Sequence, residues 1–180
     1  MRFFDVNDEW EDEIAAIETR ESANPPKEGA ILFAGSSSIR MWETLTEDFP
    51  SKDVINRGFG GSQMSDLVRH FDRIFLPSNP RQVVIFSGGN DLDAGVSPDQ
   101  VAGNFAAVCE MLAAALPETK IALIGIAPNP DRWSQRNEQQ RLIQLTSDDC
   151  VQNGHDFIDV WTPMIGEDNL PSRDLYLEDR

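Results

Sequence analysis

The sequence predicts an α/β fold, a three-layer α/β/α sandwich in which helices cover both faces of a five-stranded, mostly parallel sheet. Short apolar runs, typical of strands buried on both faces, alternate with segments whose apolar residues recur at helical spacing. Most of these runs end at glycine, serine or proline. This alternation indicates βα units with right-handed crossovers, which build a parallel sheet with helices on both faces.

Five segments are predicted as strands: residues 30–34, 53–56, 82–86, 120–126 and 157–160. The segment at 30–34 is apolar throughout and stops at Gly35, as expected for a strand in the sheet interior. The segment at 53–56 is a weaker candidate for a strand than the segment at 30–34. The segment at 82–86 is broken by Gly88 and Gly89, and a proline-rich loop at 128–130 follows the fourth segment.

Apolar residues at helical spacing predict the intervening helices. The first helix carries Val6, Trp10, Ile14 and Ile17, follows a candidate cap at Asn7 and should end before Pro25. Further helices are predicted over 64–71, from a Ser97 cap to about residue 112, and over 133–151. The chain from residue 161 onward is expected to be irregular.

The composition excludes several classes of function. The 180 residues suit one domain over 1–180, and the net charge of -16 argues against nucleic acid, because phosphate binding needs clustered Lys and Arg. No apolar run approaches the ~20 residues of a membrane helix, and no signal region follows Met1, so a cytoplasmic protein is expected. Cys109 and Cys150 fit neither a metal site nor a disulfide framework, and Cys109 is expected in the core.

Unusual residues follow the first three predicted strands. The loops begin with Gly35-Ser36-Ser37-Ser38, Gly58-Phe59-Gly60-Gly61 and Ser87-Gly88-Gly89-Asn90-Asp91. Because ligands bind beyond the carboxyl ends of parallel strands, all three loops should face one crevice. A serine hydroxyl between strand and helix is a candidate nucleophile. The backbone N–H groups of Ser37 and Gly61 and the side-chain amide of Asn90 are candidate donors to an oxyanion.

These loops resemble the first three sequence blocks of the SGNH (GDSL-like) hydrolase superfamily, in a branch that carries G-S-S-S-I in place of G-D-S-L. The similarity extends from about Ile31 to Asp179. The resemblance implies a flavodoxin-like sheet and a serine esterase acting on small acyl esters, without metal or organic cofactor. It implies Ser37 as the nucleophile, although three adjacent serines leave the alignment of this block with the family motif open by one position. Gly61, Asn90 and the Ser37 N–H would form the oxyanion hole.

The fourth block of the family is D-x-x-H, in which the Asp orients the catalytic His. Residues 177–180 match its beginning, which implies Asp179 as that Asp and places the His two positions beyond Arg180. Neither histidine of the chain is a good substitute: His70 is expected to be solvated on a helix, and His155 precedes the fifth strand, opposite the crevice. The 180-residue chain is therefore predicted to be impaired in catalysis.

Four further residues are candidates for the substrate pocket: Arg40, Arg57, Asn129 and Trp133. Three of them have a purely structural alternative, which is a surface ion pair for Arg57 and a loop and cap role for Asn129 and Trp133. Asp91 is expected to hold loop backbone rather than to do chemistry.

Two other functions compete with the esterase. The chain is alternatively a non-catalytic module that keeps the pocket and binds a small carbohydrate or acyl ligand. The loop at 35–38 is also a candidate phosphate or nucleotide site, but no Walker lysine and no G-x-G-x-x-G motif accompanies it.

Overall fold

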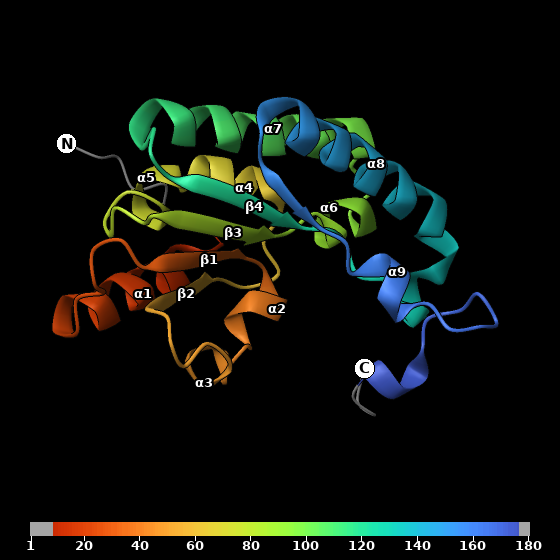
Figure 1. The fold of residues 1–180 in the computed structure, drawn as a ribbon, viewed down its shortest axis with the longest axis horizontal. Coiled ribbons are helices and arrows are strands. Elements are labelled where there is room, and N and C mark those ends of the chain that lie inside the picture. The colour runs from red at the N-terminus through yellow and green to blue at the C-terminus, as the bar shows by residue number, and fades with distance from the viewer. Residues whose placement is uncertain (1–8, 177–180) are drawn as a thin grey trace.

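The computed structural model describes residues 9–176, in which five parallel strands form one sheet with the order β2-β1-β3-β4-β5 (Figure 1). The strands are β1 (Ile31–Gly35), β2 (Val54–Gly58), β3 (Gln82–Phe86), β4 (Lys120–Ile124) and β5 (Asp156–Ile158). This is the flavodoxin-like order, and it places the topological switch point between β1 and β3. The predicted strands are confirmed, with starts within one residue and ends within two.

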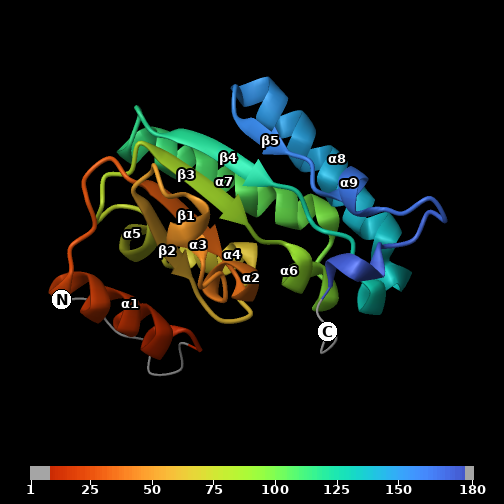
Figure 2. The ribbon, with the colours of Figure 1, turned by 60° about the horizontal axis from the view of Figure 1, so that its bottom comes forward.

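Helices lie on both faces of the sheet (Figures 1 and 2). One face is covered by α4 (Met64–Arg69), α5 (Phe71–Ile74), α7 (Pro98–Ala115) and α8 (Arg136–Asn153). The other face carries α2 (Ser37–Arg40) and α3 (Leu45–Asp48). The remaining helical segments are α1 (Glu11–Ala23), α6 (Gly89–Asp93), η1 (Pro130–Gln135), α9 (Trp161–Met164) and η2 (Arg173–Leu175). The predicted α/β/α sandwich is therefore confirmed.

The two faces of the sheet bury different amounts of apolar surface. Leu32, Val83 and Ile85 point toward α4, α5 and α7, where they are fully buried in the larger core cluster. Phe33 and Val84 point the opposite way and form a smaller cluster with the residues of α2 and α3. Cys109 lies in the larger cluster, as predicted, and burial raises the pKa of its thiol.

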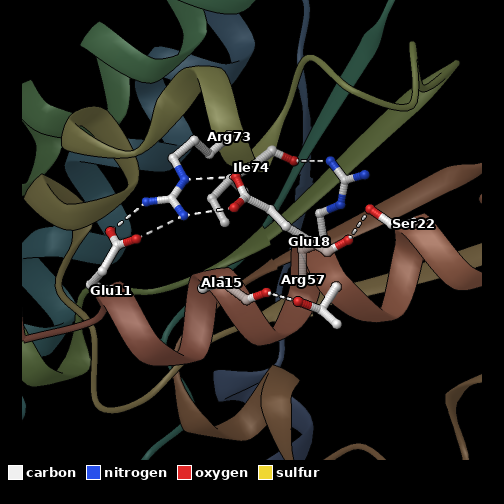
Figure 3. A network of polar contacts seen from close by, with 8 residues as sticks. Glu11, Ala15, Glu18, Ser22, Arg57, Arg73 and Ile74 are labelled. Atoms are coloured by element: carbon white, nitrogen blue, oxygen red, sulfur yellow. Dashed lines mark hydrogen bonds and ion pairs between the residues drawn. The ribbon is translucent and has the colours of Figure 1, made fainter. Parts of the chain in front are cut away.

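Ion pairs attach α1 to the rest of the domain (Figure 3). Arg73 lies between two carboxylates of α1, with its Nη1 2.6 Å from Glu11 Oε2 and its Nε 2.7 Å from Glu18 Oε1. Arg57, whose side chain is completely buried, donates to the Ile74 carbonyl and, through Nε at 2.9 Å, to Glu21. These contacts hold α1 beside β2, at the edge of the sheet.

Three details differ from the sequence-based expectation. The predicted helix at 64–71 is broken at His70, which ends α4 and precedes α5, and His70 is buried rather than solvated. The segment after residue 160 contains α9 and η2 and is not wholly irregular. The last predicted helix begins as a 3₁₀ turn and becomes α-helical only at Arg136.

Several predictions at the ends of the chain, including the Asn7 cap and the position of Asp179, lie outside the described residues. Within residues 9–176, no helix is both long and apolar enough to cross a membrane.

Candidate active site

Backbone hydrogen bonds join the carboxyl ends of β1, β2 and β3. The Phe59 N–H donates to the Gly35 carbonyl at 3.0 Å, and the Ser36 N–H donates to the Phe86 carbonyl at 3.3 Å. Gly35 has φ 148°, and a Cβ there would lie 2.0 Å from the Phe86 oxygen, so only glycine fits. The three loops predicted to share a crevice therefore meet at the switch point between β1 and β3.

The three adjacent serines occupy different positions. Ser36 precedes α2 in extended conformation and is 9% exposed. Ser37 is the first residue of α2 and is half-buried, whereas Ser38 is exposed. The N–H groups in the first turn of a helix have no intrahelical acceptor. Ser37 thus combines an accessible hydroxyl with a backbone N–H that α2 itself does not use.

Asn90 lies in the first turn of α6, immediately beside the second loop. Its Nδ2 donates to the Ser62 carbonyl at 3.1 Å. A Cβ built on Gly61 would lie 3.7 Å from the same Nδ2, in ordinary van der Waals contact. The structure thus brings together Gly61 and Asn90, two of the residues predicted as donors.

Arg132, in the turn after β4, holds the other end of the Asn90 amide. Its Nη1 lies 3.4 Å from Asn90 Oδ1 and 3.3 Å from the Gly89 carbonyl oxygen. Its Nη2 is 3.1 Å from Asp93 Oδ2. The sequence carries no signal for this contact, since Arg132 and Asn90 are on different βα units.

Asp91 connects the third loop to α4. Both carboxylate oxygens lie 3.0 Å from the Met64 backbone nitrogen, and the residue is completely buried. Burial raises the pKa of Asp91 to about 6, although the hydrogen bond from Met64 opposes this shift. The prediction that Asp91 holds backbone is confirmed.

A pocket of about 270 Å³ opens beside these loops. Ser37 and Asn90 both line it, together with the loop that follows β4 and, at the C-terminal side, Tyr176. The Tyr176 hydroxyl donates to the Pro128 carbonyl, which closes that side of the pocket. Asn129 lines the pocket, as predicted, but its Oδ1 also accepts from the Asp131 N–H at 2.8 Å.

Three predicted pocket residues lie elsewhere, and their assignment is corrected. Arg57 faces α1, because its position on β2 alternates with Asn56, and it is buried against Glu21. Arg40 is exposed at the end of α2 and pairs weakly with Glu13 at 3.4 Å. Trp133 stacks on Trp161, with ring centroids 5.7 Å apart, and is not part of the pocket lining.

Neither histidine of the sequence lines this pocket. His70 packs edge-on against Phe59, with ring centroids 6.0 Å apart, within the core below α4. His155 borders a separate groove beside Cys109 and Asp149. The expectation that neither is placed as a base for Ser37 agrees with these positions.

Comparisons with known proteins agree with the geometry. Residues 27–179 match the sequence model of the GDSL-like Lipase/Acylhydrolase family. Platelet-activating factor acetylhydrolase IB subunit alpha2 of Rattus norvegicus is 24% identical over 124 residues, which are 66% of this chain and 53% of that protein. The chain thus spans about half the length of the curated relatives it matches.

Solved structures show the same fold. A Streptococcus pneumonia structure aligns with a TM-score of 0.80 and 20% identity, covering 93% of this chain and 82% of that one. A GDSL-like lipase from Bacteroides thetaiotaomicron aligns with a TM-score of 0.75 and 21% identity, covering 92% and 86%. The meeting of the three loops and the match over most of the sequence lead to one conclusion: this chain belongs to the GDSL-like lipase/acylhydrolase family.

Proposed function

We propose that the protein is a serine ester hydrolase that acts on small acyl esters through an acyl-enzyme, with Ser37 as the nucleophile. One observation carries this proposal: the half-buried Ser37 shares a pocket with Asn90, and Gly61 adjoins the Asn90 amide. A hydroxyl beside preorganised N–H donors is the arrangement that acyl transfer requires. Membership of an acylhydrolase family supports the same reaction.

In the proposed reaction, Ser37 Oγ attacks the acyl carbonyl carbon while a general base takes its proton. The carbonyl oxygen becomes an oxyanion, which accepts hydrogen bonds from the Ser37 and Gly61 N–H groups and from Asn90 Nδ2. The ester bond then breaks, and the alcohol leaves with the proton held by the base. Water hydrolyses the acyl-enzyme in the same way and frees the acid.

The base in this proposal is a histidine two positions after Arg180, oriented by Asp179. Tyr176, the last described residue, supports this placement, because it lines the pocket and its hydroxyl donates to the Pro128 carbonyl. Without that histidine, the 180-residue chain should retain only the rate enhancement that the oxyanion hole and substrate binding provide. This enhancement is about 10³–10⁴-fold over the uncatalysed reaction in water. The protein is alternatively a binding module that uses the same pocket without chemistry.

The test compares the 180-residue chain with a form extended by the codons that follow Arg180 in the gene. We expect the extended form to hydrolyse p-nitrophenyl acetate and to react with a fluorophosphonate, and Ser37→Ala to abolish both. Ser38→Ala tests the neighbouring serine, which also lines the pocket, and Ser22→Ala is the matched control, because Ser22 is exposed on α1 and is not among the lining residues. Full activity in Ser37→Ala would exclude Ser37 as the nucleophile, whereas no activity in the extended form would favour the binding module.

A further inference from the structure

Helix α1 contacts the turn that carries Gly61. The backbone N–H of Gly60 donates to Glu13 Oε2 at 2.6 Å, across 47 positions of the sequence. The acceptor is a carboxylate, and charge-assisted hydrogen bonds are roughly twice as strong as neutral ones. Glu13 Oε1 also lies 3.4 Å from Arg40 Nη1, at the end of the helix that begins with Ser37. One side chain of α1 therefore reaches both the Gly61 turn and the helix of Ser37.

The backbone at Gly60 depends on this contact. Gly60 has φ 43°, in the left-handed region, and is followed by a second glycine, so no side chain fixes the turn. Trp10, which directly precedes α1, covers Gly60, and a Cβ there would lie 1.8 Å from Trp10 Cζ3. Gly60 is also buried, and a buried N–H without an acceptor is destabilising. The turn should therefore rearrange when the Glu13 carboxylate is removed.

The other end of the turn is held by separate contacts. The Ser62 carbonyl accepts from Asn90 Nδ2 at 3.1 Å, and Ser62 Oγ donates to the Gly35 carbonyl at 3.4 Å. Gly61 lies between these contacts and the hydrogen bond of Gly60. Fixing the residues on both sides restricts the peptide plane that carries the Gly61 N–H. An oxyanion donor is most effective when its direction is set before the reaction.

Glu13 is not needed to attach α1 to the rest of the domain. Arg73 pairs with Glu11 and Glu18 of the same helix (Figure 3). The buried Arg57 pairs with a further carboxylate near the end of α1. These pairs should remain when Glu13 is replaced, so the helix should stay in place and the effect should be local to the glycine turn.

We propose that Glu13 is a positioning residue for catalysis, which fixes the Gly60-Gly61 turn and thereby the direction of the Gly61 N–H in the oxyanion hole. The inference rests on the proposed esterase function, because it assigns a role within that reaction. Glu13 does not line the Ser37 pocket and acts through the backbone of Gly60. An uncharged acceptor of the same length should therefore serve nearly as well as the carboxylate.

Steady-state hydrolysis of p-nitrophenyl acetate by the extended form tests this role. We expect Glu13→Ala to lower kcat about 10–100-fold with little change in KM, because a misdirected donor acts mainly on the transition state. Glu13→Asp keeps the charge but is one methylene shorter, and it should lose kcat in the same way. Glu13→Gln should restore most of kcat, because its amide oxygen still accepts from the Gly60 N–H.

Glu18→Ala is the matched control, since it removes a carboxylate from the same helix that pairs with Arg73 and not with the turn. It should leave kcat unaltered. Equal losses of kcat in Glu13→Ala and Glu18→Ala would overturn the positioning role, because any loosening of α1 would then suffice. Equal losses in Glu13→Ala and Glu13→Gln would also overturn it, because the hydrogen bond to Gly60 would not be the cause.

NMR measures the contact in the 180-residue chain without catalysis. Glu13→Ala should shift the amide signals of Gly60 and Gly61 and raise the solvent exchange rate of the Gly60 N–H at least tenfold, whereas Glu18→Ala should change neither. Unchanged exchange at Gly60, or faster exchange with an unchanged kcat in the extended form, would refute the positioning role but not the hydrolase. An extended natural chain without any ester turnover would refute the hydrolase and, with it, the role of Glu13.

Discussion

Arg132 Nη1 lies 3.4 Å from Asn90 Oδ1, while Asn90 Nδ2 is held at 3.1 Å by the Ser62 carbonyl. The amide is therefore held at both ends, and Asn90 lines the pocket that Ser37 shares. A cation at the amide oxygen also polarises the amide and strengthens its N–H groups as donors. This relationship predicts that the two residues act on turnover as one unit.

Replacing Asn90 by Ala should lower kcat of the extended form about 10²–10³-fold, because one oxyanion donor is lost. The measurement is steady-state hydrolysis of p-nitrophenyl acetate. KM should change little, since the donor acts mainly on the transition state. An unaltered kcat would remove Asn90 from the oxyanion hole.

Replacing Arg132 by Met should lower kcat by about 10-fold, a smaller loss than that of Asn90→Ala, because Arg132 acts through Asn90. Arg132→Lys should recover part of the loss. In the double variant with Asn90→Ala, the Arg132 change should have no further effect. Arg136→Met serves as the matched control, since Arg136 contacts Trp133 and not the amide. Additive losses in the double variant would contradict the proposed coupling.

Asp91 should make the free energy of unfolding depend on pH. The pKa of Asp91 is raised to about 6 in the folded protein, above its ordinary value of 3.8. The folded state therefore binds a proton more tightly than the unfolded state does. The resulting stabilisation is complete below about pH 4 and is lost as the pH rises through about 6.

Urea denaturation of the natural chain and of Asp91→Asn, compared from pH 4 to pH 7, measures this contribution. The stability difference should move by about 1–3 kcal/mol in favour of the variant as the pH rises. A difference that stays constant, or that moves the other way, would show that Asp91 has no raised pKa.

Replacing Glu21 by Ala should lower the free energy of unfolding by about 3–5 kcal/mol, because it leaves the buried Arg57 guanidinium without its carboxylate. Asp53→Ala breaks the exposed pair between Lys27 and Asp53 and should cost about 0–1 kcal/mol. Denaturant unfolding of both variants measures the contrast. If both variants lost the same free energy of unfolding, burial would not explain how much each ion pair contributes to stability.

Two glycines of the site should respond differently to alanine. Gly35→Ala should prevent stable folding, since its Cβ would overlap the Phe86 carbonyl. Gly61→Ala should fold, because its Cβ meets Asn90 Nδ2 only at 3.7 Å, yet lose ester turnover by crowding the oxyanion. Thermal unfolding and p-nitrophenyl acetate hydrolysis separate the two effects. A fully active Gly61→Ala would exclude Gly61 from the site.

Patterns along the sequence predicted most of the fold and part of the site. Strand positions follow from local apolar runs. The carboxyl ends of parallel strands meet at one edge of the sheet, and this predicted that the loops of Ser37, Gly61 and Asn90 lie together. Arg57 was misplaced because alternation along β2 decides which face a side chain takes, and β2 was the weakest of the predicted strands. His70 was misjudged because a break in the helix turns it into the core.

The sequence by itself determined the parallel sheet, the order of helix and strand, and the three loops that meet at one edge. These features follow from local periodicity and from glycines at positions whose backbone conformation only glycine adopts easily. Only the tertiary structure decided that Arg132 holds Asn90 and that Asp91 ties its loop to α4. Such pairs join separate βα units, and their distances depend on how the helices pack on the sheet.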